Sequence, residues 1–376
     1  MRISDFDYAL PSELIAQRPS DRRDGSRLLV VPPSGEFGHR TFGDLPDLLQ
    51  SGDALVVNRS RVFPARLLGR KPTGAQAEIL LVRPIAESVA EDNETSEAGI
   101  AGRAEQVASS PWDASSTLWE ALVRPGGKLK PGRTVVVSEE LEVDIVDTLP
   151  SGNRVVRLRA DGPLEEVLDR CGHIPLPPYI DRPDAPEDRD RYQTVYAADR
   201  GSIAAPTAGL HFTDDLLRRI EQLGVVRAEV TLHVGVGTFR PVEVDDPARH
   251  PMHAEWYSVS EEAADTINAT RAAGGRVWAV GTTVVRTLES VVGDDGLVRP
   301  GQGETKLFIR PPWDFKVVDG LVTNFHLPRS TLLMLVASLA GYERTMAAYA
   351  EAVERGYRFY SYGDAMVITP SSVRSV

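Results

Sequence analysis

The chain has little of what marks secreted, disulfide-bonded or membrane-spanning proteins. Its 376 residues include one cysteine, Cys171, so no disulfide can form within the chain and no CxxC pair exists. Such cysteine usage fits a reducing compartment, and we expect a cytoplasmic protein. The longest apolar run, 332–340, is well below the roughly 20 residues that span a bilayer. The start, MRISDFDYAL, carries acids where a secretory signal carries an apolar run.

Basic residues are also fewer than acidic ones, 42 against 54, so the formal net charge is −12. Residues 84–117 alone hold seven acids against Arg103, a contribution of −6, and their composition predicts disorder. Residues 1–83 differ, with twelve basic and ten acidic side chains. A local basic surface for nucleic acid is therefore compatible with the acidic total, although solvated loop charges would give the same pattern. The candidate phosphate-binding residues are Arg22, Arg23, Arg27, Arg59 and Arg61.

The length predicts more than one domain, at about 150 residues for each. From 61 to 159, short apolar stretches such as AEILLV, TVVVS and RVVRLR alternate with Pro and Gly, which predicts a small antiparallel β-barrel. Beyond this segment, helical and strand patterns alternate. We expect a mixed α/β (α+β) catalytic domain formed by 1–60 and 160–376, with the barrel domain 61–159 inserted into it.

The pattern outside the barrel predicts individual helices and strands. Thr213 is expected to cap one helix, Ser330 or Thr331 a second, and Thr282 or Thr283 a third. The segment GYRFYSYGDAMVI alternates like a strand that ends in Gly363 and Asp364. The expected helices are 163–171, 214–223, 261–273, 283–292, 330–340 and 342–355, and the expected strands include 225–234 and 276–280.

Residues 201–257 hold four of the seven histidines among many glycines and prolines, which indicates an active site. His211 and Phe212 precede a helix start, and a lone histidine there would more often be structural. His233 ends a strand on its polar face, just before Gly235 and Gly237, where backbone can approach a ligand closely.

Two familiar kinds of site fit this region poorly. The GxG of Gly235 and Gly237 lacks the helix that a dinucleotide-binding loop needs, because Thr238 to Pro241 follow instead. His250, His253 and Glu255 have a spacing that could hold zinc, but no HExxH or cysteine set completes it. We therefore expect no metal.

Further polar residues mark two helix entrances. VWAVGTTVVRTLES predicts a buried strand, a glycine turn and a helix whose free amide groups would face a polar ligand at Thr282 and Thr283. On that helix, Arg286 and Glu289 are spaced to pair. Asn324 and His326 stand in a loop before a wholly apolar helix, an arrangement typical of a pocket.

Many long motifs occur in one order along nearly the whole chain outside 84–117. They are SDFDYALPSELIAQRP, GDALVVNRSRVFPARL, IPLPPYI, DRYQTVYA, AAPTAGLHFT, LHVGVGTFRPV, MHAEWY, VGTTVVRTLES, VVDGLVTNFHLPRSTLLMLV and GYRFYSYGDAM. Together they resemble the S-adenosylmethionine:tRNA ribosyltransferase-isomerase family of queuosine biosynthesis. Two departures are Arg59-Ser60, where the family usually has Asp-Thr, and Pro312-Trp313, where Gly-Tyr is usual.

The resemblance implies that the ribosyl part of S-adenosylmethionine is transferred and isomerised onto 7-aminomethyl-7-deazaguanine in the tRNA wobble position. Epoxyqueuosine-tRNA, adenine and methionine would be the products, with S-adenosylmethionine as co-substrate, no prosthetic group and no membrane contact. The sulfonium acidifies the C5′ proton, so a histidine could remove it. We expect His211 to be that base, with His233, His253 and Glu255 orienting ribose or leaving groups. The expected S-adenosylmethionine contacts are Phe212, Gly235, Gly237, Thr238, Thr282, Thr283, Asn324 and His326.

Three alternatives stay open at this point. A relative that uses a free deazapurine as acceptor would keep the same motifs without a tRNA surface. A methyltransferase would bind the same co-substrate but release S-adenosylhomocysteine. A noncatalytic tRNA-binding module would need none of the pocket residues.

Overall fold

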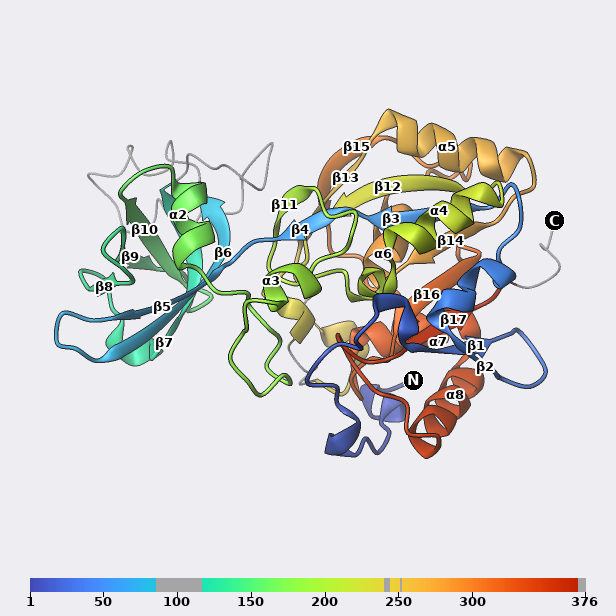
Figure 1. The fold of residues 1–376 in the computed structure, drawn as a ribbon, viewed down its shortest axis with the longest axis horizontal. Helices are drawn as coiled ribbons and strands as arrows, with labels where there is room; N and C mark the ends of the chain where they lie inside the picture. Colours follow the sequence, from blue (N-terminus) through green and yellow to red (C-terminus); the bar gives the residue numbers. More distant parts are fainter. Residues whose placement is uncertain (86–116, 240–243, 251, 371–376) are drawn as a thin grey trace.

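The computed structural model describes residues 1–85, 117–239, 244–250 and 252–370. It shows a β-barrel beside a larger lobe of helices and strands (Figure 1). Most of the acidic stretch, from 86 to 116, lies outside the described residues, so the expectation for it stays a prediction. None of the described helices is long and apolar enough to cross a membrane.

The larger lobe is built on one mixed sheet. Its strands are β1 Arg27–Val31, β2 Gly38–Thr41, β3 Ala54–Asn58, β12 Val226–Leu232, β13 Glu255–Val259, β14 Val277–Val280, β15 Gly301–Thr305, β16 Gly320–Asn324 and β17 Ala365–Ile368. They lie in the order β15-β13-β12-β3-β14-β16-β17-β1-β2. The neighbours β12, β3, β14 and β16 are parallel, so their carboxyl ends meet at one edge. Ligands bind at that edge in open α/β sheets.

Six of the described helices confirm the predicted positions to within about two residues, the usual uncertainty of helix ends, and the seventh, Asp188–Arg191, was not predicted. They are α2 Leu164–Cys171, α3 Asp188–Arg191, α4 Asp214–Gln222, α5 Glu261–Ala272, α6 Thr282–Val291, α7 Thr331–Ala340 and α8 Tyr342–Glu354. Short 3-10 helices span Ile3–Phe6, Ser12–Leu14, Arg23–Gly25, Phe42–Leu48, Gly126–Lys128, Thr207–His211, Val236–Phe239 and Pro247–Arg249.

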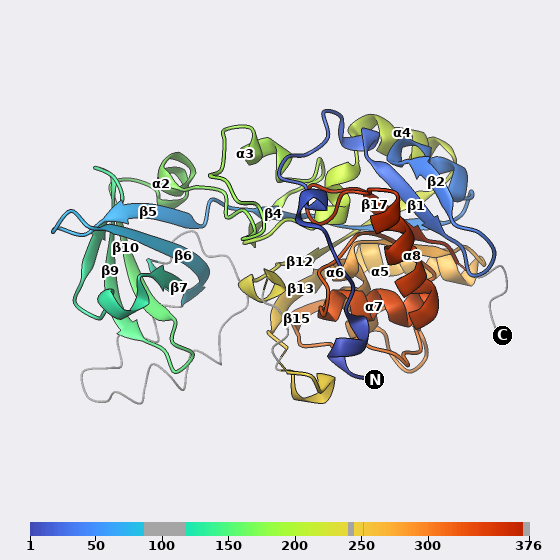
Figure 2. The ribbon, with the colours of Figure 1, turned by 90° about the horizontal axis from the view of Figure 1, so that it is seen from below.

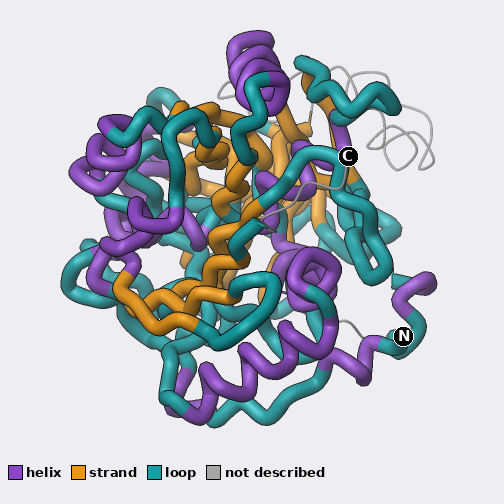
Figure 3. Tube along the Cα trace, turned by 90° about the vertical axis from the view of Figure 1, so that its right-hand side faces the viewer, coloured by secondary structure: helices purple, strands orange, loops and turns teal. Residues whose placement is uncertain are grey.

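Helices cover both faces of the sheet, as Figures 2 and 3 show. The core on one face includes side chains of α5, α6, α7 and α8, and the core on the other includes α4 and Phe42–Leu48. Because the central strands are buried on both sides, their sequences ALVV and VWAV are continuously apolar rather than alternating.

The predicted antiparallel barrel is confirmed. Its strands are β5 Arg66–Arg70, β6 Gln76–Ile85, β7 Leu118–Arg124, β8 Thr134–Val136, β9 Leu141–Thr148 and β10 Arg154–Ala160. They close in the order β10-β7-β6-β5-β8-β9. The helix α2 buries Val167 and Leu168 in the barrel core, although its position lies beyond the expected barrel boundary. Between the lobes, β4 Ser60–Val62 pairs with β11 Asp199–Ser202. The domain boundaries at 60/61 and 159/160 stay a prediction.

Two local predictions are wrong. The cap of α6 is Gly281 at φ +90°, not Thr282 or Thr283, whereas Thr213 and Ser330 do cap their helices. Glycine is needed at this φ because a side chain rarely tolerates it.

The strand expected over GYRFYSYGDAMVI, ending in Gly363 and Asp364, does not form, because β17 begins only at Ala365. Tyr360 has φ +71°, which is incompatible with an extended strand. Asp364 then folds the segment back, since its carboxylate accepts the backbone N–H groups of Arg27 and Arg358. This loop brings Tyr360 and Ser361 to the cavity described next.

Candidate active site

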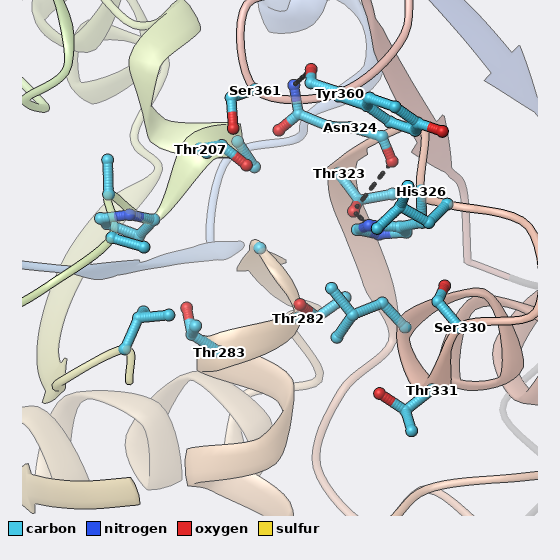
Figure 4. Close-up of a pocket in the computed structure, with 18 of the residues that line it drawn as sticks. Thr207, Thr282, Thr283, Thr323, Asn324, His326, Ser330, Thr331, Tyr360 and Ser361 are labelled. Carbon is cyan, nitrogen blue, oxygen red and sulfur yellow. Dashed lines mark hydrogen bonds between the residues drawn. The ribbon is translucent and has the colours of Figure 1, made fainter. Parts of the chain in front are cut away.

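The carboxyl edge of the parallel strands carries most of the candidate residues. Ser60 follows β3, His233 follows β12 and Gly281 follows β14, while Asn324 ends β16. Thr282 and Thr283 face Asn324 and Ser361 across a cavity at this edge (Figure 4). The topology therefore gathers residues that are more than 250 positions apart in the sequence.

The cleft has three adjoining arms. The first lies between the starts of α6 and α7 and the strand end at Asn324. The second has an apolar wall that includes Phe308, Ile309 and Leu335, and the polar side chains of His250, His253, Glu255 and Arg286 also line it. The third lies between the barrel and the sheet edge, and it is lined by Trp119, Asn153, His233 and Trp256. Two residues, Gly237 and Glu255, line all three arms.

Two serines hold the ring of His233 in place. Ser60 Oγ lies 2.7 Å from Ser202 Oγ, which accepts the N–H of Val234. Ser60 Oγ also lies 2.7 Å from His233 Nδ1, so a tautomer with its proton on Nδ1 would donate to Ser60 and leave the lone pair on Nε2. The ring also stacks on Trp256, with centroids 5.1 Å apart.

The second nitrogen of His233, Nε2, has no hydrogen-bond partner among the described residues. It lies above Gly201, where an added Cβ would come within 2.7 Å of it, so glycine makes room for the ring. Burial lowers the pKa of His233 to about 4, although Asp199 raises it slightly. The imidazole is therefore neutral near pH 7, and the side chain lines the third arm.

His211 is placed differently from our expectation. Its Nδ1 lies 2.7 Å from Ser26 Oγ, and its Nε2 lies 3.0 Å from the amide nitrogen of Asn324. Both ring nitrogens are thus engaged, the side chain is buried against Phe42, and it lines none of the three arms. Burial lowers its pKa to about 4. This geometry favours a structural role in which His211 orients Asn324.

Glu255 forms a buried ion pair where the arms meet. One oxygen accepts the N–H of Gly235 at 3.1 Å, and the other accepts from Arg286. Arg286 also donates to the carbonyl of Leu307. The expected pairing of Arg286 with Glu289 does not occur, because the Glu289 carboxylate accepts backbone N–H groups of residues 316–318 instead.

His250 and His253 lie at the second arm beside Gly237. Burial, and secondarily the charge of His253, lower the pKa of His250. His253 is exposed and also lines the third arm. Within the described residues, no three His, Cys, Asp or Glu side chains are grouped so that they could hold a metal ion.

The expected contacts to S-adenosylmethionine divide into two groups. Thr282, Thr283, Asn324 and His326 line the first arm, and Gly235 lines the third, with Gly237 shared. Phe212 is fully buried in the core beneath the sheet and lines none of the arms. The side chain of Thr238 lies outside what the structure describes.

Two of the expected phosphate-binding arginines are used inside the protein. Arg23 donates to the carbonyls of Leu210 and Asp190. Arg27 pairs with Asp364 and lies over the ring of Tyr357, 4.1 Å from its centroid. Their guanidinium groups hold loops together, so we no longer place a phosphate at them.

The other three arginines are nearer to solvent. Arg22 pairs with Asp24, and Arg59 pairs with Asp199 and Glu229. Arg61 is exposed and makes no ion pair with a described residue. The role of these three in binding nucleic acid stays a prediction.

The sequence reasoning missed a basic segment on the barrel. Arg124, Lys128, Lys130 and Arg133 are exposed, and none of them pairs with an acid in the described part of the chain. No acidic residue occurs between 121 and 138, which is the signal that could have revealed the segment. Arg154, which follows the third-arm residue Asn153, donates to the carbonyls of Gly126 and Leu129 in this segment.

Comparison with known proteins agrees with this architecture. The chain matches the model of a family described as queuosine biosynthesis protein over residues 3–368, and it belongs to that family. It is 53% identical over 371 residues to the S-adenosylmethionine:tRNA ribosyltransferase-isomerase of Pelotomaculum thermopropionicum, covering 98% of this chain and 100% of the relative. The protein of the same name from Symbiobacterium thermophilum is 52% identical over the same length and coverage.

A solved structure is also similar. The crystal structure of S-adenosylmethionine tRNA ribosyltransferase from Thermotoga maritima has 38% sequence identity and a TM-score of 0.51. The match covers 97% of this chain and 100% of that one. The combination of sheet and closed barrel is thus shared with a solved member of the same enzyme class.

The buried histidines make a prediction about acid stability. Burial lowers the pKa values of His211, His233 and His326 to about 4, 4 and 3, from 6.5. The unfolded chain therefore binds more protons than the folded one below pH 6.5. The stabilisation from the neutral imidazoles is complete above pH 6.5 and should be lost progressively as the pH falls towards 4. Urea unfolding at pH 7, 6, 5.5 and 5 measures this, and an unchanged free energy of unfolding would contradict it.

Proposed function

We propose that this chain is an S-adenosylmethionine:tRNA ribosyltransferase-isomerase. It transfers and isomerises the ribosyl part of S-adenosylmethionine onto 7-aminomethyl-7-deazaguanine in the wobble position of tRNA. The products are epoxyqueuosine-tRNA, adenine and methionine. Family membership supports the proposal, and the observation that carries it is the buried, neutral His233, which lines the cleft between barrel and sheet.

The chemistry requires a neutral base beside the ribose. The sulfonium makes the C5′ hydrogen acidic, and an imidazole with an available lone pair can remove it. His233 meets this requirement in the tautomer that donates its Nδ1 proton to Ser60, because Nε2 is then left for the substrate. We therefore assign the base to His233 in place of His211, whose two nitrogens are occupied.

The two departures from the usual family motifs do not remove this machinery. Ser60 keeps the hydroxyl that the usual threonine would supply, and that hydroxyl contacts His233. Arg59 points to Asp199 and Glu229 instead of the cleft. Trp313 packs against the core beside α5–α8.

The remaining candidates surround the point where the arms meet. Glu255 is held by Arg286 and the N–H of Gly235, so its carboxylate is fixed where a ribose hydroxyl or the sulfonium would lie. His253, which is exposed at the second and third arms, is placed to donate a hydrogen bond to departing adenine. The apolar wall of the second arm suits the flat adenine ring.

The third arm would take the base of the tRNA, and the segment 124–133 would contact its phosphates. Exposed cations without acidic partners are what phosphate binding needs. This segment favours a tRNA substrate over a free deazapurine, which would gain little from a basic surface. The 3-10 helix Val236–Phe239 after Gly235 also disfavours a methyltransferase with a dinucleotide-type loop.

Product analysis tests the reaction. Purified protein with S-adenosylmethionine and precursor tRNA should release adenine and methionine in equal amounts, and chromatography of the digested tRNA should show the modified nucleoside. Release of S-adenosylhomocysteine with methylated RNA would reject the proposal. Turnover on the free base without tRNA would instead support the alternative acceptor.

A second prediction concerns the basic segment. Replacing Lys128, Lys130 and Arg133 by Ala should flatten the dependence of log binding constant on log salt by about two to three units, at roughly 0.7–0.9 per lost phosphate contact. The matched control replaces three exposed arginines that already pair with acids, Arg218, Arg249 and Arg299. This control variant changes the net charge by the same amount, and its dependence of log binding constant on log salt should stay as in the unmodified protein. An unchanged slope in the barrel variant would return the tRNA surface to Arg22, Arg59 and Arg61.

A further inference from the structure

The start of α6 presents unoccupied backbone donors to the first arm. Its N-cap is Gly281, which has no side chain to cap the helix, and Thr282 and Thr283 follow at the cavity wall. The N–H of Gly281 itself is bonded to the carbonyl of Val322. The first amides of α6, together with the helix dipole, therefore favour a negatively charged ligand group.

An unpartnered acceptor lies on the opposite wall of the same arm. Asn324 is only 2% exposed, and its Nδ2 contacts two acceptors, His211 Nε2 at 3.0 Å and the carbonyl of Tyr360 at 3.2 Å. This arrangement fixes which amide atom is nitrogen. Among the described residues the Oδ1 atom has no hydrogen-bond partner, and Figure 4 shows it on the side of Thr207 and Ser361, which also line the cavity. A buried acceptor of this kind needs a ligand donor.

The first arm thus offers donors for an anion on one wall and an acceptor for an N–H group on the other. A free α-amino acid end carries both a carboxylate and an ammonium group. We infer that this arm binds the amino-acid end of S-adenosylmethionine, with the carboxylate at Thr282 and Thr283 and the ammonium at Asn324 Oδ1. The inference rests on the proposed function, and it deepens that function by assigning one end of the substrate to one arm.

The assignment also orders the rest of the substrate. With the amino-acid end in the first arm, the sulfonium and ribose reach Gly237 and Glu255, which line all three arms. Adenine then lies on the apolar wall of the second arm, and C5′ faces the third arm, where His233 lies. In this placement the carboxylate end is the part of the ligand farthest from the tRNA.

Binding measurements without turnover test the inference. Isothermal titration calorimetry on the full chain would compare S-adenosylmethionine with its decarboxylated analogue and with its 2-oxo acid analogue, which lacks the ammonium. Each analogue should bind at least about tenfold more weakly, since a hydrogen bond to a charged group contributes roughly that factor or more. Thr282→Val should weaken the binding of S-adenosylmethionine by a similar factor. It should also reduce the difference in affinity between S-adenosylmethionine and the decarboxylated analogue.

The matched control is Thr287→Val, on the same helix. Its hydroxyl donates to the carbonyl of Thr283 and does not line the cavity, so both affinities should stay as in the unmodified protein. Equal binding of the decarboxylated analogue and S-adenosylmethionine would overturn the assignment and leave the proposed reaction standing. Failure of the unmodified protein to bind S-adenosylmethionine at all would reject the proposed function, and this assignment with it.

Discussion

One buried amide holds the parts of the site in register. Asn58, at the carboxyl end of β3, accepts the N–H groups of Ser60 and Leu232 and donates to the Leu232 carbonyl and to Thr283 Oγ1. All of its hydrogen-bonding positions are used in a site that is closed to solvent. Replacing it would leave several buried groups unpaired, at about 1–3 kcal/mol for each. The hydroxyl that contacts His233, the strand end before His233 and the start of α6 therefore have one shared anchor.

The shape of the cleft suits a reaction in which methionine and adenine leave one ribose and an acceptor joins it. A sulfonium substrate has an amino-acid end and a nucleobase, and the acceptor approaches as a third body. The three arms meet at Gly237 and Glu255, so each group can occupy its own arm while the ribose stays at the centre. The charges are also unevenly distributed. Exposed cations lie on the barrel at 124–133, while the chain as a whole is acidic.

Much of the fold could be predicted from local pattern, and the errors have identifiable causes. Helices α4 and α7 were predictable because Thr213 and Ser330 cap them, and because α4 has regularly spaced apolar residues while α7 is a continuous apolar run. The prediction of a strand over 356–364 was wrong because Tyr360 takes a positive φ, which the alternating sequence does not reveal. The predicted cap of α6 was wrong because the capping residue is a glycine, which acts through its backbone alone.

Several residues singled out in the sequence lie at one edge of the sheet, but their individual contacts could not be predicted. His211 and His233 look alike in sequence, and only their partners, Ser26 and Ser60, distant along the chain, separate an engaged ring from an available one. Arginine has a similar ambiguity, because its planar fork binds carbonyl oxygens as readily as phosphate. Arg23 and Arg27 use theirs for carbonyls and Asp364, which charge clustering could not show.

The most direct test of this account is the single-turnover rate of ribosyl transfer to prebound tRNA in the variant His233→Gln. Glutamine keeps a polar side chain of similar length but cannot act as a base near pH 7. The rate should fall by about 10² to 10⁴, the usual contribution of general base catalysis, while the affinity for tRNA is retained. A near-normal rate in this variant would contradict the assignment of the base to His233.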